Sequence, residues 1–317
     1  MTNKSKKPIL FLEPVFKQMI WGGNRLREKY GYHIPSENTG ECWGIAAHPT
    51  GDCVIADGVY QGKTLSHLWK EQPELFGNPE EKEFPLLIKI LDAREDLSIQ
   101  VHPDDAYARE NENGASGKTE CSYILDCPEN AELIVGHTAR TKEELQEMVS
   151  KGEWNRLIRR VPIKKGDFIQ VEPGTVHAIT KGLLLLEIQQ NSDVTYRIYD
   201  YDRLQNGKPR QLHIKQGLDV IQVPATPVEK CIKNVNHLPK DKMNLLLSNQ
   251  CFSVWKLDLT SSFEVEQNYP FLAVSVMEGE GSIDGHPIKK GDNFILPFGY
   301  GKAIFEGQIS LMMTSAR

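Results

Sequence analysis

The chain has 317 residues, of which 39% are hydrophobic and 25% charged, and its formal net charge at pH 7 is −6. A chain of this length can bury a large core and form two domains without disulfide support. Acidic and basic residues are interspersed and the only basic run is Lys4 to Lys7. The sequence therefore argues against a nucleic-acid-binding surface.

The cysteines and the apolar runs indicate the cellular compartment. The six cysteines contain no Cys-x-x-Cys pair, and the longest apolar stretch is the short LLLLEI segment from Leu183 to Ile188. A membrane helix needs roughly 20 apolar residues, and the N-terminal apolar run is too short for a signal peptide. We expect a cytoplasmic protein with reduced thiols and no membrane contact.

Short strand-like segments dominate, and Gly, Pro and Asp turns separate them at close intervals, which favours a β-sandwich or β-barrel. Helical segments are few, and we interpret them as insertions on a β scaffold. In chain order the predicted elements are a helix at Ser66–Lys70, an apolar strand in PLLIKIL, a strand-like stretch at Gln100–His102, a helix at Asp104–Glu110, a strand at Glu132–Val135, helical segments at Thr141–Trp154 and Trp154–Arg159, and strands at Phe168–Val171, Leu183–Gln189, Val194–Tyr199, Phe252–Leu259, Ala273–Met277 and Asn293–Leu296.

The clearest helix signal is TKEELQEMVSKGEW, in which Thr141 can cap the N-terminus and Glu144 completes a capping box.

An internal repeat gives the domain organisation. KKGDFIQVEPGTVHAI, from Lys164, aligns with KKGDNFILPFGYGKAI, from Lys289, at a constant offset of 125 residues. Two unrelated β-hairpins could also produce such a match.

The repeat places Lys302 where the first copy has His177. We therefore expect a metal site in the first half and none in the second. The predicted domains are a metal-binding catalytic domain over 1–230, with a helical insertion near 141–160, and a C-terminal domain over 240–317. The roughly 75 residues after the Pro224–Pro239 boundary are few for a closed barrel, so strands from elsewhere in the chain could complete it.

Three segments carry candidate metal ligands. In IQVHPDD, Gln100 and His102 lie two residues apart and therefore face the same side of a strand. Glu120 stands at a strand start in GKTE, with Lys118 on its own face, and His177 follows the Pro-Gly turn of PGTVHAI. An isolated histidine is usually a hydrogen-bonded structural residue. Two imidazoles and a carboxylate together form the ligand set of many catalytic zinc sites, although non-haem Fe(II) oxygenases use the same set.

Six segments in order carry a family resemblance: FLEPVFKQMIWGG, PLLIKIL, IQVHPDD, GKTE, PGTVHAI and VTYRIYDYDR. With them the sequence resembles a type I mannose-6-phosphate isomerase, in its short bacterial form, over essentially its whole length. The resemblance implies a mainly β fold of two cupin-type (jelly-roll) barrel halves. It also implies interconversion of mannose 6-phosphate and fructose 6-phosphate through an enediol. Some longer members have Lys-Pro-Glu in place of Lys118-Thr119-Glu120, and a larger helical insertion.

The resemblance further implies one Zn²⁺ per chain, bound by His102, Glu120 and His177, with Gln100 as a further ligand or close neighbour. Arg197 is then an active-site residue, whereas the sequence by itself would also allow a surface salt bridge to Asp200 or Asp202. The forked, permanently charged guanidinium suits a phosphate or an enediolate oxygen.

Lys118 and Lys89 are candidates for phosphate binding or proton transfer. Lys89 lies in the apolar strand PLLIKIL and either extends outward to solvent or lines the barrel. The general base stays unassigned among Lys118, a metal-bound water and a neighbouring carboxylate. We expect a monomer or a weak dimer with a sugar phosphate as ligand. A sugar-phosphate-binding protein without catalysis is an alternative that the intact ligand set argues against.

Overall fold

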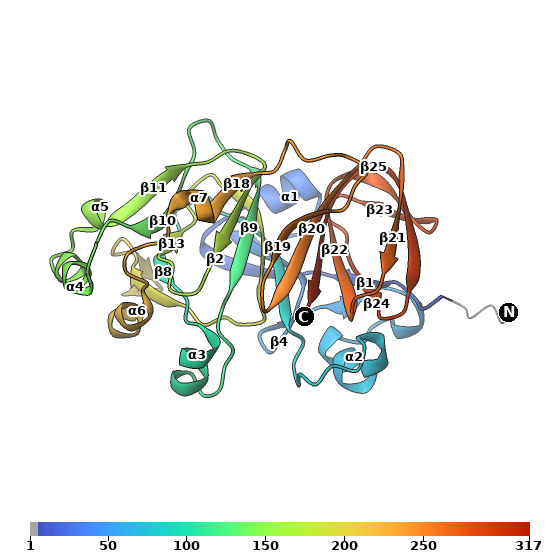
Figure 1. The fold of residues 1–317 in the computed structure, drawn as a ribbon, viewed down its shortest axis with the longest axis horizontal. Coiled ribbons are helices and arrows are strands. Elements are labelled where there is room, and N and C mark those ends of the chain that lie inside the picture. Colours follow the sequence, from blue (N-terminus) through green and yellow to red (C-terminus); the bar gives the residue numbers. More distant parts are fainter. Residues whose placement is uncertain (1–5) are drawn as a thin grey trace. The chain divides into compact units, whose positions relative to one another are not determined.

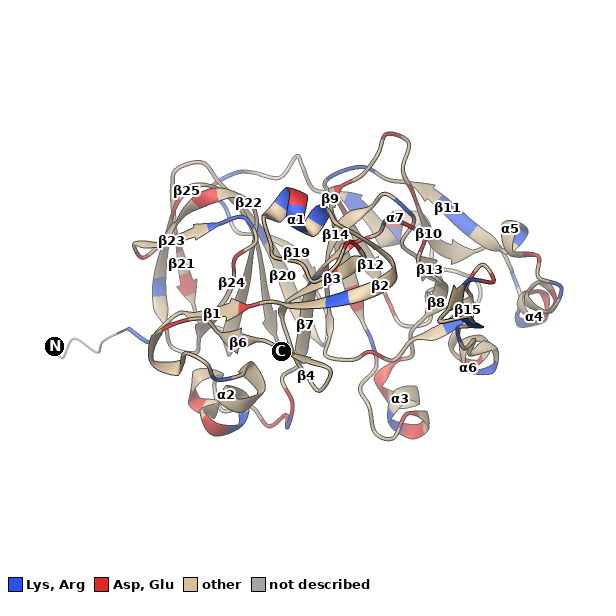
Figure 2. Cartoon of the chain, turned by 180° about the vertical axis from the view of Figure 1, so that it is seen from behind, with Lys and Arg blue, Asp and Glu red and all other residues tan. Residues whose placement is uncertain are grey.

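Strands dominate the fold, as the turn-punctuated apolar runs predict (Figure 1). The structure is a computed structural model that describes residues 6–317. No helix in this range is long and apolar enough to cross a membrane. Positively and negatively charged residues are interspersed along the described elements (Figure 2).

Contacts divide the chain into two compact units, and each is made of several segments. Unit 1 comprises Met1–Val15, Cys42–Lys89 and His237–Arg317, and unit 2 comprises Phe16–Glu41 and Ile90–Asn236. The sequence instead predicts contiguous domains over 1–230 and 240–317. One unit border, between Asn236 and His237, lies close to the predicted boundary, but unit 1 also takes two N-terminal segments.

Unit 1 is built on a nine-stranded sheet in the order β19-β20-β25-β22-β24-β1-β6, with β21 on β25 and β23 on β22. The N-terminal strand β1 (Leu10–Glu13) pairs with β24 (Asn293–Pro297), and β6 (Val54–Ile55) pairs with β1. These strands supply the pairing that the C-terminal segment alone lacks, because an uncovered edge would leave backbone groups unpaired. The other strands are β4 (Ala47–His48), β5 (Gly51–Asp52), β19 (Asn244–Ser248), β20 (Phe252–Leu259), β21 (Ser262–Gln267), β22 (Phe271–Ile283), β23 (His286–Lys289) and β25 (Gly301–Ala316).

An aromatic cluster supports unit 1 beside the helix α2 (Leu65–Glu71) and the 3₁₀ turns Gly58–Tyr60 and Pro73–Leu75. Phe84 lies 5.3 Å from the Trp69 ring and 5.1 Å from the Phe271 ring, and Phe76 contacts all three. Phe84 is 1% exposed.

Replacing Phe84 with alanine should therefore destabilise the protein by about 3–5 kcal/mol, because it removes a buried ring and leaves a cavity. Urea unfolding followed by tryptophan fluorescence measures this change. Phe298, which is 44% exposed, provides the control, and Phe298→Ala should cost well under half as much. Equal losses for the two variants would contradict the assigned packing.

Unit 2 contains a five-stranded sheet in the order β11-β10-β13-β8-β15 and most of a seven-stranded sheet in the order β18-β12-β9-β14-β7-β3-β2. Apolar side chains of β9, β10, β12 and β14 form one core cluster that joins the two sheets, including Ile124, Val135, Ile169 and Leu185. The strands of these sheets are β2 (Val15–Gly23), β3 (Thr39–Ile45), β7 (Leu86–Asp92), β8 (Ile99–Val101), β9 (Glu120–Asp126), β10 (Glu132–His137), β11 (Ile158–Pro162), β12 (Asp167–Val171), β13 (His177–Ala178), β14 (Leu184–Gln190), β15 (Tyr196–Tyr199) and β18 (Ile232–Asn234), with the small hairpin β16 (Leu204–Gln205) and β17 (Lys208–Pro209). A border between the units falls within β2, within β3 and within β7.

Helices cover the outer face of the five-stranded sheet. A second core cluster joins Ile99 and Val101 of β8 and Ile134 of β10 to side chains of α4 (Lys142–Ser150), including Leu145 and Met148. Residues that alternate with these, such as Gln100, therefore face the interior between the sheets. The other helices of unit 2 are α1 (Arg25–Tyr30), α3 (Asp105–Asn111), α5 (Trp154–Leu157), α6 (Ile214–Val220) and α7 (Val228–Cys231).

The predicted start of α4 is confirmed, and two details differ. Thr141 Oγ1 accepts from the Glu144 backbone N–H at 3.2 Å, while the Glu144 carboxylate accepts from the N–H of Arg140, not of Thr141. The second helical segment ends at Leu157 and not at Arg159. Residues 158–162 instead pair with β10 as β11, because strand pairing outweighs a weak local helical preference.

The internal repeat is confirmed as a repeated turn. Gly166 and Gly291 both have positive φ, 87° and 96°. In each copy the Asp carboxylate after the glycine accepts from a lysine backbone N–H at 2.8 Å, Asp167 from Lys164 and Asp292 from Lys289. Each turn leads into an apolar strand, β12 in unit 2 and β24 in unit 1.

Candidate metal centre

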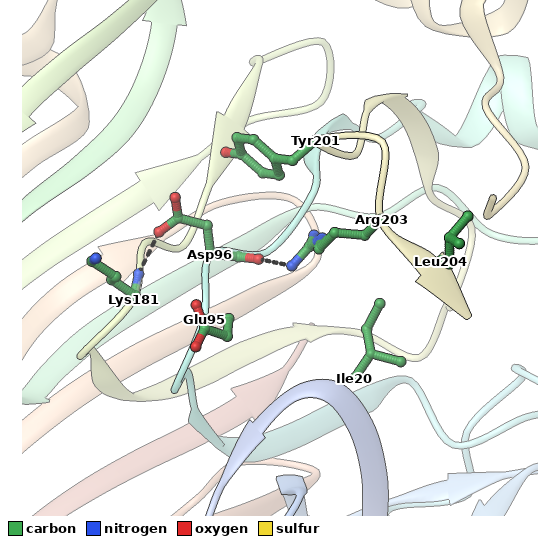
Figure 3. A pocket seen from close by; sticks show the side chains of 7 residues that line it. All are labelled: Ile20, Glu95, Asp96, Lys181, Tyr201, Arg203 and Leu204. Carbon is green, nitrogen blue, oxygen red and sulfur yellow. Dashed lines mark hydrogen bonds between the residues drawn. The ribbon is translucent and has the colours of Figure 1, made fainter. Parts of the chain in front are cut away.

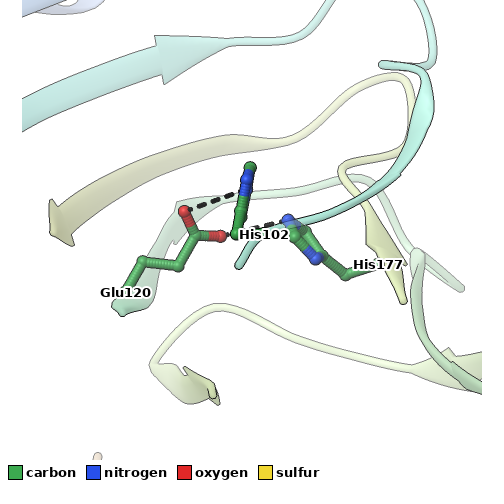
Figure 4. A group of neighbouring side chains, drawn as sticks. All are labelled: His102, Glu120 and His177. Carbon is green, nitrogen blue, oxygen red and sulfur yellow. Dashed lines mark ion pairs between the residues drawn. The ribbon is translucent and has the colours of Figure 1, made fainter. Parts of the chain in front are cut away.

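Three buried side chains gather at one point of unit 2: His102, which directly follows β8, Glu120, which begins β9, and His177, which begins β13 (Figure 4). One potential ligand atom from each lies within 4.8 Å of the others. Their exposed fractions are 1%, 2% and 4%, so each needs an internal partner. Two imidazoles and a carboxylate in this arrangement could bind a metal ion.

The strand register explains why residues so far apart in sequence meet. His177 pairs directly with Gln100 across β13 and β8, and Glu120 pairs with Val171 across β9 and β12. Val171 belongs to the interior core cluster, so Glu120, its direct partner, faces the interior as well. The ligands thus come from both sheets.

Both imidazoles are oriented by backbone carbonyls. His102 Nδ1 lies 2.9 Å from the Val194 carbonyl oxygen, and His177 Nδ1 lies 3.0 Å from that of Thr175. A carbonyl only accepts, so each Nδ1 carries a hydrogen, and Nε2 is the ring nitrogen that could bind a metal. The two Nε2 atoms lie 3.5 Å and 3.1 Å from the Glu120 carboxylate. This backbone support is typical of metal-binding histidines.

Gln100 lies beside this cluster. Its amide nitrogen is 3.3 Å from His177 Nε2, and its amide oxygen accepts from the Ser98 hydroxyl at 3.4 Å. Gln100 therefore neighbours the candidate ligands from the same face of β8, as the two-residue spacing predicts.

Lys118 also lies at the centre of the cluster. Its Nζ is 2.6 Å from Glu120 Oε2 and 3.0 Å from His102 Nε2. A second carboxylate, Glu187 on β14, lies 3.9 Å from the same Nζ. All four side chains are buried, so their charges interact at low effective dielectric.

These neighbours set the protonation of the ligands. Burial lowers the pKa of His102 well below its ordinary value, and the Lys118 ammonium lowers it further. Burial would raise the pKa of Glu120, but Lys118 and the two histidines outweigh burial and hold that pKa well below its ordinary value. At neutral pH His102 is neutral and Glu120 is ionised, which are the forms that bind metals.

Arg197 lies on the same face of the five-stranded sheet as Gln100 and His177. It pairs with Gln100 across β15 and β8, so Arg197, Gln100 and His177 share the inner face of three neighbouring strands. Its Nη1 donates to the Gln211 carbonyl at 3.0 Å, while its buried Nε has no hydrogen-bond partner within residues 6–317. Asp200, a candidate salt-bridge partner, binds Arg203 and Arg210 instead.

Lys89 is buried in β7 at 8% exposure, so it does not extend to solvent, which was one of its two predicted orientations. It belongs to unit 1, whereas the cluster belongs to unit 2.

Glu187 was not predicted. Its signal is present in the sequence, because it is the single carboxylate in the apolar run Leu183–Ile188.

Beneath the carboxylates the barrel interior is almost filled. A cavity of about 10 Å³ remains there, lined by Glu120, His177 and Glu187 together with apolar residues such as Ile169 and Leu185. That is roughly the space of one water molecule. A sugar phosphate could therefore not be bound beneath the carboxylates.

The equivalent positions of unit 1 carry no such ligands. Lys302, at the position of His177, is 66% exposed and pairs with Glu264 at 2.8 Å. The repeat aligns Val171 with Leu296. Glu120 pairs with Val171, and Leu272 pairs with Leu296, so Leu272 occupies in unit 1 the position that Glu120 has in unit 2. Leu272 belongs to the apolar core of unit 1. Among the described residues, the His102 cluster is the one group of metal-ligand type.

Comparisons with known proteins agree with this geometry. Residues 9–155 match the family "Phosphomannose isomerase type I, catalytic domain", and residues 242–316 match "Mannose-6-phosphate isomerase, cupin domain". The chain is 52% identical to the mannose-6-phosphate isomerase ManA of Bacillus subtilis over 94% of this chain and 96% of the relative. It is 46% identical to the mannose-6-phosphate isomerase of Streptococcus mutans over 96% of each.

Solved structures show the same fold. The crystal structure of the mannose 6-phosphate isomerase from Bacillus subtilis superimposes with a TM-score of 0.88 at 48% identity, covering 97% of this chain and 99% of that one. A putative mannosephosphate isomerase from Archaeoglobus fulgidus has a TM-score of 0.78 at 17% identity over 99% of this chain and 100% of that one, which supports the fold alone.

Proposed function

Because this chain belongs to the type I mannose-6-phosphate isomerases, we propose that it interconverts mannose 6-phosphate and fructose 6-phosphate with one zinc ion held by His102, Glu120 and His177. The observation that carries the proposal is the buried cluster, in which both Nε2 atoms face one carboxylate. Membership of this family argues against the two alternatives, a non-haem iron oxygenase and a sugar-phosphate-binding protein without catalysis.

The donor set fits zinc. Two imidazoles, oriented by backbone carbonyls, and one ionised carboxylate are the three protein ligands of many catalytic zinc sites. Gln100 neighbours His177 through its amide nitrogen and would add a neutral oxygen ligand only after its amide turns over. Bound zinc would supply Lewis-acid polarisation of the sugar carbonyl and stabilise negative charge on the oxygens of an enediol intermediate.

The chain's own residues bind the substrate and move the proton. Arg197 presents a half-buried guanidinium with an uncommitted Nε and would hold an anionic oxygen of the substrate. Lys118 Nζ, which lies between Glu120 and Glu187, would donate a proton to a substrate oxygen or take one up. We assign Lys89 to substrate binding on its position in the PLLIKIL motif.

The wider setting follows from the sequence. We propose a cytoplasmic enzyme that works as a monomer or a weak dimer on a small sugar phosphate. We propose neither a nucleic acid nor a membrane as its partner.

Isomerisation in D₂O tests the reaction path. An enediol mechanism passes the C2 proton through a protein group, so deuterium should appear at C1 of fructose 6-phosphate by NMR. Metal analysis of the same sample should show zinc at about one ion per chain. A product with no deuterium at any conversion would indicate hydride transfer and contradict the proposal. Iron in place of zinc would contradict the metal assignment alone.

A further inference from the structure

A strap of 14 residues, 200–213, connects β15 to α6 and contains the β16–β17 hairpin. One buried carboxylate closes it. Asp200, 4% exposed, accepts from Arg210 Nε at 2.6 Å, from Arg210 Nη2 at 2.5 Å and from Arg203 Nη2 at 2.5 Å. The two ends of the strap are thus joined through a two-pronged, charge-assisted pair.

The far end of this strap contacts Arg197. The Gln211 carbonyl accepts from Arg197 Nη1 at 3.0 Å, and the His213 N–H donates to the Arg197 carbonyl at 2.7 Å. The next residue back is Arg210, which Asp200 holds. The guanidinium of Arg197 is therefore oriented by a backbone segment whose position depends on Asp200.

The strap is held against its own conformational preference. Tyr201 and Asp202 are consecutive non-glycine residues in the left-handed region, with φ of 56° and 54°. Such a turn costs free energy and persists where surrounding contacts fix it. The Arg203 guanidinium adds such a contact, because its Nη1 donates to the Asp96 carbonyl (Figure 3).

Positive charge surrounds Asp200, and the strap lines a cavity of mixed charge. Arg197, Arg203 and Arg210 lie around the single carboxylate of Asp200. Burial lowers the pKa of Arg197, and Arg210 and Arg203 lower it further. The strap also lines a cavity of about 410 Å³, of a size that holds small ligands. Figure 3 shows its walls: Ile20, Glu95, Asp96, Lys181, Tyr201, Arg203 and Leu204.

We propose that Asp200 is a positioning residue: by binding Arg210 it closes the strap and sets the Arg197 guanidinium for the anionic substrate. The proposal rests on the proposed function of Arg197. The Asp200 carboxylate then has two opposite effects on substrate binding. As a charge, Asp200 opposes binding of an anion, whereas as a clamp it supports binding.

Asp200→Asn distinguishes the two effects, because it adds one net positive charge while removing the charge-assisted clamp. We expect KM for mannose 6-phosphate to rise about tenfold, with a smaller change in kcat. Asp202→Asn is the matched control: it makes the same charge change in the same strap at an exposed residue, and asparagine tolerates the left-handed region. Its KM should be unchanged or slightly lower.

A double mutant tests whether Asp200 acts through Arg197. In an Arg197→Ala background, Asp200→Asn should have almost no further effect, because neighbouring residues in one network are not additive. Arg210→Lys keeps the positive charge but loses the forked guanidinium, so it should raise KM as Asp200→Asn does. It replaces Asp200→Asn in the test if that variant shows no cooperative thermal unfolding.

The outcomes separate the two proposals. If Arg197→Ala impairs the enzyme but Asp200→Asn and Arg210→Lys leave KM unchanged, or if the double mutant is additive, the positioning role is wrong. If Arg197→Ala itself changes neither KM nor kcat, the proposed function of Arg197 is wrong.

Discussion

Replacing Glu120 with glutamine should reduce kcat by roughly 10³-fold and remove most of the bound zinc. The substitution keeps the size of the side chain but deletes the one negative charge that faces both Nε2 atoms. It also leaves the Lys118 ammonium without its partner at 2.6 Å. A buried cation that loses its partner is costly, so the variant should also unfold at a lower temperature than the parent.

Zinc content, the rate of isomerisation and the thermal midpoint would be measured on one preparation. Glu132→Gln is the matched control, because it makes the same chemical change on a carboxylate that is 45% exposed at the start of β10. The control should keep its zinc and its rate. A Glu120→Gln enzyme with full activity would overturn the metal assignment.

Replacing Arg197 with alanine should reduce kcat/KM by about 10²-fold to 10³-fold. Arg197 shares a face with Gln100 and His177, and its buried Nε has no hydrogen-bond partner among the described residues. A lysine should restore only part of the loss, because it lacks the planar fork. Steady-state kinetics with mannose 6-phosphate would measure all three enzymes.

The kinetic constant that changes identifies the substrate oxygen. An increase in KM with loss of competitive inhibition by inorganic phosphate would indicate contact with the phosphate, whereas a fall in kcat would indicate contact with the reacting oxygens. Arg160→Ala removes a guanidinium that is 42% exposed and should change neither constant. Arg197→Ala with unchanged KM and kcat would exclude the proposed role.

Part of the site could be predicted because strand alternation is local. The two-residue spacing of Gln100 and His102 determines their common face, and the same rule places Lys118 beside Glu120. Glu187 was missed because its role depends on which strands pair. The pairing of β14 with β9 follows from the folded register, which the local pattern does not contain.

The features of the fold that the sequence did not predict also depend on long-range strand pairing. The strands β1 and β6 join a sheet whose other members come from residues 244–316, and nothing local in LFLE or VI specifies that partner. The full length of β25 was not predicted, because Gly307 interrupts its pattern at a positive φ of 120°. The repeat, in contrast, could be read from the sequence because its Gly-Asp turn needs a particular backbone conformation.

A coupled assay of mannose 6-phosphate isomerisation, before and after removal of metal by a chelator and again after zinc is restored, tests the central claim most directly. The His102, Glu120 and His177 cluster predicts activity that disappears with the chelator and returns with zinc. Full activity in protein shown to be free of metal, or no activity in the zinc-loaded protein, would contradict a zinc-dependent isomerase.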